Sequence, residues 1–122
     1  MPRAAFNPGG EAKLHCECVH WFKAQYPAFA DLLVYINNNS ANAITGHLNR
    51  LKGTVAGFPD LVLFVPRGRF SGLAIEFKKP GEKPKPHQVA IHARLTAQGY
   101  AVAVVDSKSQ FMILIQEYLA KS

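Results

Sequence analysis

Two acidic motifs in the middle of the chain carry residue types that can hold a divalent metal ion. Asp60 follows a Gly-Phe-Pro turn, and Glu76 comes later in the chain, with Lys78 two positions beyond it. Side chains of a strand alternate between its two faces, so Glu76 and Lys78 would point the same way and Phe77 the other way. If the segments that carry them pair as antiparallel strands, Asp60 and Glu76 come within reach of one ion.

Two carboxylates and a backbone carbonyl, here that of Phe77, make a hard oxygen site suited to Mg²⁺ or Mn²⁺. Such an ion polarises a phosphoryl oxygen and lowers the pKa of a bound water. Lys78 would add a positive charge that steadies the developing negative charge. The motifs therefore predict phosphodiester hydrolysis by water. The simpler alternative is that Asp60 caps a turn and that Glu76 and Lys78 form a surface ion pair.

Short apolar runs bounded by proline and glycine must position these motifs. Leu61 to Val65 and Leu73 to Phe77 each predict a buried strand, and the turn between them predicts a hairpin. Apolar residues at three- and four-residue steps predict helices elsewhere. The remaining expected elements are a helix from Glu11 to Gln25, a strand from Leu33 to Asn37, a mobile basic loop with about one helical turn from Ala43 to Gly57, a helix from Pro86 to Gln98, a strand from Ala101 to Val105 and a helix from Phe111 to Leu119.

This order predicts a single α/β domain over residues 1–122, with residues 1–10 flexible and a mixed central β-sheet flanked by helices. The last strand should join the sheet beside an earlier one. No apolar run approaches the ~20 residues of a membrane-spanning helix, and the first residues lack the apolar core of a signal peptide. We therefore expect a soluble protein of a reducing cytoplasm, in a bacterium or a phage-infected host cell.

The charge balance favours a polyanionic partner. Fourteen Lys and Arg against eight Asp and Glu give a net charge of +6, which suits nucleic acid or an anionic membrane. Any one basic residue can equally be an ordinary surface charge. The basic residues expected to contact phosphates are His47, Arg50, Lys52, Arg67, Arg69, Lys79, Lys83 and Lys85.

Three motifs, in order, resemble the stand-alone VRR-NUC branch of the PD-(D/E)xK nucleases: residues 57–61 (Gly-Phe-Pro-Asp-Leu), residues 72–78 (Gly-Leu-Ala-Ile-Glu-Phe-Lys), and Gln88 with the Gly-Tyr pair at 99–100. The resemblance covers about residues 11 to 106. It implies a restriction-endonuclease-like core and an Mg²⁺- or Mn²⁺-dependent endonuclease that works as a homodimer on branched DNA such as Holliday junctions. Nucleases of flaps, nicks or plain duplex, and a DNA-binding module that does not cut, remain alternatives.

The resemblance also implies a carboxylate from the first helix and a glutamine near the site. At ~100° per residue, Glu11 lies on the apolar stripe of that helix, whereas Glu17 is turned roughly 120° away. We therefore expect Glu11 to be the third carboxylate ligand, beside Asp60 and Glu76; the alternative is a favourable charge at the helix start. Gln88 faces the sheet, where it would contact the site or bond to the backbone. His15 stands where relatives often carry glutamine.

Two further features admit more than one interpretation. The first helix carries His15, Cys16, Cys18 and His20, which are zinc-ligand types, but Cys16 and Cys18 point ~200° apart on a helix and cannot grip one ion. In the last helix, Phe111, Ile113 and Ile115 could form a dimer surface, with burial in the core as the alternative.

Overall fold

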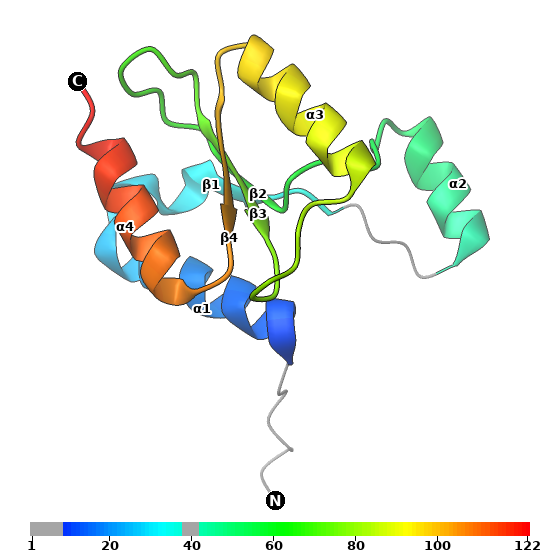
Figure 1. Ribbon diagram of the computed structural model, residues 1–122, viewed down its shortest axis with the longest axis horizontal. Helices are drawn as coiled ribbons and strands as arrows, with labels where there is room; N and C mark the ends of the chain where they lie inside the picture. The colour runs from blue at the N-terminus through cyan, green and yellow to red at the C-terminus, as the bar shows by residue number, and fades with distance from the viewer. Residues whose placement is uncertain (1–8, 38–41) are drawn as a thin grey trace, which may run out of the picture.

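Four strands form one mixed sheet in the computed structural model, which describes residues 9–37 and 42–122 (Figure 1). The strands are β1 (Leu33–Tyr35), β2 (Leu61–Leu63), β3 (Leu73–Phe77) and β4 (Ala101–Val105), and they lie side by side in that order. β2 pairs antiparallel with both β1 and β3, and β4 pairs parallel with β3. The α/β prediction is confirmed, as is the position of the last strand beside an earlier one.

Helices cover the two faces of the sheet unequally. On one face lie α1 (Gly10–Gln25) and α4 (Lys108–Leu119), which pack against each other. On the other face α3 (Pro86–Ala97) packs against β4. The core lies beneath α1 and α4, where Phe22, Phe111 and Ile115 bury their side chains among the inward residues of β2 and β3. None of the described helices is long and apolar enough to cross a bilayer.

The buried face of α4 decides between the two alternatives for this helix in favour of core burial. Phe111 and Ile115 are completely buried, so they are core residues and not part of a dimer surface; of the three candidates in this helix, Ile113 alone is exposed. The helix also begins earlier than expected, at Lys108, because the side chain of Ser107 accepts a hydrogen bond from the Gln110 N–H and caps it.

The expectation of a mobile loop from Ala43 to Gly57 was wrong for its first half. A nine-residue helix, α2 (Ala43–Leu51), occupies it. The side chain of Asn42 accepts a hydrogen bond from the Thr45 N–H at 2.8 Å, which is a standard helix start. The glycines and basic residues of this segment suggested a loop. The Asn42 cap and the helical spacing of its aliphatic residues favour the helix instead.

Candidate active site

A hydrogen bond across the hairpin brings the two acidic motifs together. Leu61 of β2 lies opposite Ile75 of β3, so the residue before β2 meets the end of β3. There the backbone N–H of Phe77 donates to Oδ2 of Asp60 at 2.8 Å. The predicted antiparallel pairing is confirmed, and it sets Asp60 beside Glu76.

Glu76 is a buried carboxyl group with polar neighbours. Its side chain is 3% exposed, and it lies on the sheet face that α3 covers. Burial raises its pKa to about 8, and the negative charge of Asp60 adds to this effect, while Lys78 lowers the pKa. The two carboxyl groups also share a hydrogen bond. Glu76 therefore retains a proton at neutral pH in the metal-free protein.

Two side chains of α3 hold the two oxygens of this carboxyl group. Nε2 of Gln88 donates to Oε2 of Glu76 at 3.4 Å, and Nε2 of His92 lies 3.4 Å from Oε1. Burial lowers the pKa of His92, and the charge of Lys78 lowers it further, which favours a neutral ring with one N–H to donate. Sequence reasoning missed His92, although its spacing of four residues from Gln88 placed it on the same helical face.

Gln88 has a second role that the sequence left open. Its Oε1 accepts a hydrogen bond from the backbone N–H of Lys85 at 2.8 Å, so the same amide closes the first turn of α3 and reaches Glu76. The two alternatives for Gln88, a contact in the site and a bond to the backbone, are thus both present.

Lys78 is buried beside the carboxyl pair. It is 5% exposed, and its Nζ lies 3.7 Å from Oε1 of Glu82. The backbone N–H of Lys78 donates to the carbonyl of Val105 at 2.9 Å, which fixes the end of β3 against β4. A cation is therefore held next to Glu76 by the sheet itself.

The start of α1 turns Glu11 and not Glu17 toward these residues. Glu11 lines a small hollow together with Lys78 and Asp106, and its charge contributes to the raised pKa of Glu76. Glu17 is exposed, and its Oε1 lies 3.9 Å from Nζ of Lys13 in an ion pair along the helix. This placement agrees with the helical-face argument, while the role of Glu11 as a ligand stays a prediction.

His15, also on α1, forms part of the wall beside Asp60. Its ring centroid lies 4.9 Å from that of Tyr35 and 5.0 Å from that of Phe77. Burial lowers its pKa, and the charge of Asp60 opposes the shift. The ring therefore packs as a neutral aromatic group within electrostatic reach of the site.

Asp60, Glu76 and Gln88 border a cavity of about 270 Å³ between the start of β2 and the first turn of α3. Gly57 has a φ of +87°, and a Cβ at this position would lie 2.6 Å from the carbonyl oxygen of His87, so only glycine allows the loop to pass under the helix. The cavity, which we call the catalytic pocket, is lined by Tyr35, Ile36, Ala56, Gly57, Phe58, Asp60, Glu76, Lys85, His87 and Gln88.

The donor set fits a hard divalent cation in its chemistry. Among the residues that the structure describes, no three His, Cys, Asp or Glu side chains gather as a ready-made metal cluster. However, the buried Glu76 carboxyl group lies beside that of Asp60, and a cation relieves the repulsion between such groups when both ionise. Asp60 and Glu76 suit Mg²⁺ or Mn²⁺, which keep several waters and take one or two carboxylates from a protein.

The basic residues predicted to contact phosphates lie in several parts of the structure. Lys85 lines the catalytic pocket, Lys79 borders the hollow beside Glu11, and Lys52 lines a neighbouring cavity. Lys83 lies in the exposed segment between β3 and α3. His47 and Arg50 are exposed on α2.

Arg67 and Arg69 are not brought to the catalytic pocket. They lie in the turn at the opposite end of the β2–β3 hairpin from Asp60 and Glu76. Nε of Arg67 donates to the carbonyl of Leu119 at 3.2 Å, and its guanidinium lies over the ring of Phe29. Arg67 therefore ties the turn to the end of α4, a structural task that its sequence position did not indicate.

Comparison with known proteins points to one family. The family model described as "VRR-NUC domain" matches residues 4–109. A similar curated protein is "Putative nuclease p44" of Acyrthosiphon pisum secondary endosymbiont phage 1, which is 45% identical over 58 residues. That match covers 48% of this chain and 60% of the phage protein, so it spans less than two thirds of that relative's length.

Solved structures share the fold. A "VRR_NUC domain protein" superposes with a TM-score of 0.79 at 24% identity and covers 96% of this chain and 93% of its own. A second structure, titled "VRR_NUC domain", has a TM-score of 0.56 at 28% identity and covers 88% of this chain and 96% of its own. With the family model matching most of the sequence, the chain belongs to the VRR-NUC domain family of nucleases.

Proposed function

We propose that this protein is a metal-dependent endodeoxyribonuclease that hydrolyses DNA phosphodiester bonds with water. The observation that carries the proposal is the buried Glu76 carboxyl group beside Asp60, with the buried side chain of Lys78 in electrostatic contact with Glu76. Burying this carboxyl group costs free energy when it ionises, which marks it as a candidate functional group, and Mg²⁺ or Mn²⁺ is the ligand that suits its chemistry.

Each residue has a distinct task in this proposal. Asp60, Glu76, Glu11 and the carbonyl of Phe77 hold the ion, which supplies Lewis acidity and a more acidic water when bound. The Phe77 N–H orients Asp60, and Gln88 and His92 orient Glu76.

Lys78 supplies the charge that stabilises the phosphorane-like transition state. Its ion pair with Glu82 and its backbone bond to Val105 hold its position before DNA arrives. A cation fixed in advance needs no reorganisation during the reaction, which is the source of its catalytic value.

Branched DNA is the substrate we propose, and a homodimer is the acting form. The net charge of +6 and the lysines around the catalytic pocket favour a phosphate backbone as partner. A four-way junction has two-fold symmetry, so a symmetric dimer would place one catalytic pocket at each of two equivalent strands. Cutting of flaps, nicks or plain duplex is the alternative within the same chemistry, and binding without cleavage is the alternative outside it.

The test compares a four-way junction, a flap and a linear duplex in Mg²⁺, Mn²⁺ and EDTA. We expect cleavage with either metal, fastest on the junction, and none in EDTA. Glu76→Gln should abolish cleavage and leave junction binding intact, whereas the matched control Glu117→Gln, an exposed carboxylate on α4, should cut normally. Binding of all three DNAs without cleavage in any metal would identify a non-cutting module.

A further inference from the structure

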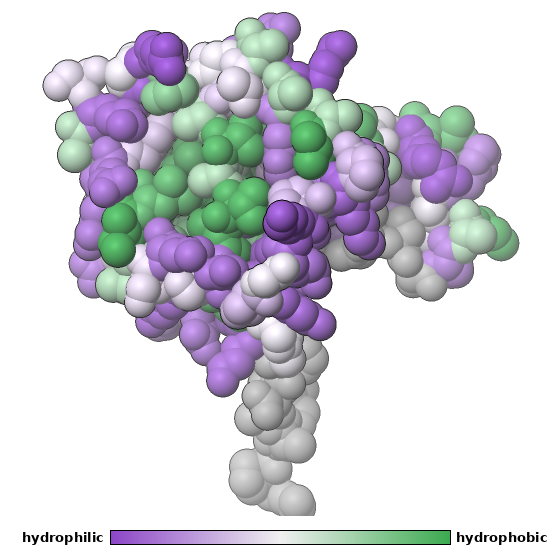
Figure 2. Space-filling model, viewed as in Figure 1, coloured by the Kyte–Doolittle hydropathy of each residue, from purple (hydrophilic) through white to green (hydrophobic). Residues whose placement is uncertain are grey.

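The helix α2 turns its apolar side away from the molecule. Ile44, Leu48 and Leu51 recur at steps of four and three residues and form one stripe. Ile44 is 84% exposed and Leu51 is 72% exposed. The buried residue of the helix is Gly46, which lies about 200° round the helix from Ile44. The hydrophobic residues of the projecting α2 are visible at the right of Figure 2. This is the reverse of the usual orientation of a surface helix.

The sheet has a matching apolar area that none of the helices in residues 9–37 and 42–122 covers. Val34 pairs with Val62, and Val62 pairs with Ala74, so these side chains share the face on which α3 lies. Because α3 packs against β4, the β1–β2 half of this face stays open. Val34 is exposed there, and Phe64 is 46% exposed.

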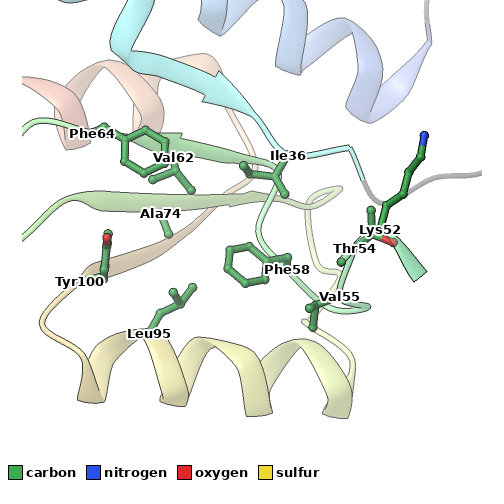
Figure 3. Close-up of a pocket in the computed structure, with 11 residues that line it drawn as sticks. Ile36, Lys52, Thr54, Val55, Phe58, Val62, Phe64, Ala74, Leu95 and Tyr100 are labelled. Carbon is green, nitrogen blue, oxygen red and sulfur yellow. The ribbon is translucent and has the colours of Figure 1, made fainter. Parts of the chain in front are cut away.

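A cavity of about 500 Å³ sinks into this open half. In Figure 3 the ring of Phe58 lies in it, with Leu95 rising from α3 below and Val55 entering from the segment that follows α2. We call this cavity, together with the exposed Val34, the open hollow; its lining residues are predominantly apolar. An α/β sheet normally has helices over both faces, and in the part of the chain that the structure describes α3 covers the β4 side of this face.

We propose that α2 of a second copy of this chain covers the open hollow, in a two-fold dimer that exchanges its α2 helices. The stripe of α2 and the open hollow have complementary chemistry and shape: one is a convex aliphatic stripe and the other a concave apolar cavity. Because both belong to the same chain, a symmetric pair makes the contact twice and leaves neither surface exposed.

The exchange would also bring basic groups to the partner's site. Ile36 and Phe58 line both the open hollow and the catalytic pocket, so a helix seated on the first lies beside the second. His47 and Arg50 are carried on the same helix as the stripe. Each copy would therefore supply phosphate-binding cations beside the catalytic pocket of the other. This role rests on the proposed nuclease function and specifies the dimer proposed there.

The first test is the oligomeric state of the full chain, measured by sedimentation equilibrium without DNA or metal. We expect a dimer for the natural sequence. Leu48→Glu should raise the dimer dissociation constant at least about 100-fold, because the charge enters both contacts. The matched control is Ile113→Glu, on the exposed side of α4 beside Val104, which should stay dimeric. Thermal melts of both variants establish that each is folded.

A monomeric natural protein, or a dimer broken by Ile113→Glu and not by Leu48→Glu, would overturn the proposal; the second pattern would assign the interface to the β4–α4 side. Because these measurements contain no DNA, a stable dimer that fails to cut would refute the proposed function and leave the interface standing. A folded Leu48→Glu monomer that resolves junctions as well as the natural protein would refute the functional role of the exchange.

The second test separates exchange from closure within one chain. Leu48→Cys and Phe64→Cys are combined with Cys16→Ser, which removes the exposed natural thiol, and treated with a flexible bis-maleimide. We expect a covalent dimer on a denaturing gel, and little from either single cysteine. A cross-linked monomer would mean that α2 folds over its own hollow, and loss of cross-linking when duplex DNA is added would mean that DNA is the natural occupant. Either result would refute the exchange.

Discussion

The N–H of Phe77 donates to Oδ2 of Asp60 at 2.8 Å, which joins the last residue of β3 to the residue that precedes β2. The bond fixes the direction of the Asp60 carboxylate toward Glu76, the neighbour of Phe77. A ligand that the backbone orients in advance loses little freedom when an ion binds. The geometry of the carboxyl pair is therefore a property of the hairpin and does not depend on the ion.

Asp60→Asn should separate the charge of this residue from its shape. The amide oxygen can still accept the Phe77 bond, so the fold should be retained, but a negative ligand is lost. We expect the single-turnover cleavage rate to fall about 100- to 1,000-fold, the range seen when a group that stabilises the transition state is removed. The pKa of Glu76 should fall as well, because the charge of Asp60 helps to raise it. Cleavage at the natural rate would show that Asp60 is not a ligand.

The stability of the metal-free protein should depend on the protonation of Glu76. Its pKa is raised from 4.5 to about 8, so the folded state binds this proton more tightly than the unfolded state. The resulting stabilisation is complete below about pH 4.5 and is lost as the pH rises to about 8. Thermal melts in EDTA should therefore show a falling melting temperature over this interval, and Glu76→Gln should flatten that fall.

The same proton should compete with the metal ion. Mg²⁺ needs the ionised carboxylate, so its binding to the natural protein should release a proton below about pH 8. We expect a given Mg²⁺ concentration to raise the melting temperature more at a pH above the pKa of Glu76 than at a pH below it. Calorimetric titration in two buffers of different ionisation enthalpy measures the released proton directly. An equal metal effect at both pH values would contradict a role for Glu76 as ligand.

Glu11 and Glu17 form a matched pair on one helix. Glu11 faces Lys78 and Asp106, and Glu17 faces solvent beside Lys13. Glu11→Gln should lower the cleavage rate at least about tenfold and raise the metal concentration needed for half-maximal cleavage, because a hard cation loses one anionic ligand. Glu17→Gln should leave both unchanged. The opposite result would overturn the argument from the helical face.

His92 should act by positioning Glu76. His92→Phe keeps the ring but removes the contact at 3.4 Å to Oε1, and we expect kcat to fall about 10- to 100-fold, as for other groups that orient a metal ligand. KM for DNA should change little because the His92 side chain is only 14% exposed and contacts Glu76. His92→Gln, which restores a donor, should recover part of the rate. If His92 had only a structural role, both variants would have a lower melting temperature, and His92→Gln would cut no faster than His92→Phe.

The two sides of α4 should respond differently to truncation. Phe111 is completely buried and its ring lies 6.0 Å from that of Trp21 and 6.1 Å from that of Phe77. Phe111→Ala should lower the free energy of unfolding by about 3–5 kcal/mol, the usual cost of such a cavity. Ile113→Ala, on the exposed side, should cost about 0.5 kcal/mol or less. Chemical denaturation measures both.

Sequence patterns predicted the elements that carry the catalytic chemistry. The apolar runs before and after the turn at Arg67 defined β2 and β3, and the period-two alternation of β3 placed Glu76 on one face and Phe77 on the other. The pairing of Asp60 with Glu76 followed from these local signals. Helical spacing also favoured Glu11 over Glu17, in agreement with their positions in the structure.

Relations across the fold were beyond those signals. The contact of His92 with Glu76 needs α3 to lie over this strand, which no local pattern specifies. Likewise, the charge of Arg67 suggested a phosphate-binding residue. Its hydrogen bond to the carbonyl of Leu119 could not be predicted, because the two residues are 52 positions apart in the sequence. The α2 helix was missed for a different reason: the glycines and basic residues of its segment suggested a loop, although its aliphatic residues recur at helical spacing.

The backbone contact between Gly57 and His87 joins the two halves of the catalytic pocket mechanically. At Gly57 the loop before Asp60 passes so close to His87, in the first turn of the helix that carries Gln88, that no Cβ would fit between them. Movement of this loop on DNA binding would therefore also move α3. The contacts of Gln88 and His92 with the Glu76 carboxyl group would then change as the DNA binds. The close packing at Gly57 would thus couple DNA binding to the orientation of the Glu76 carboxyl group.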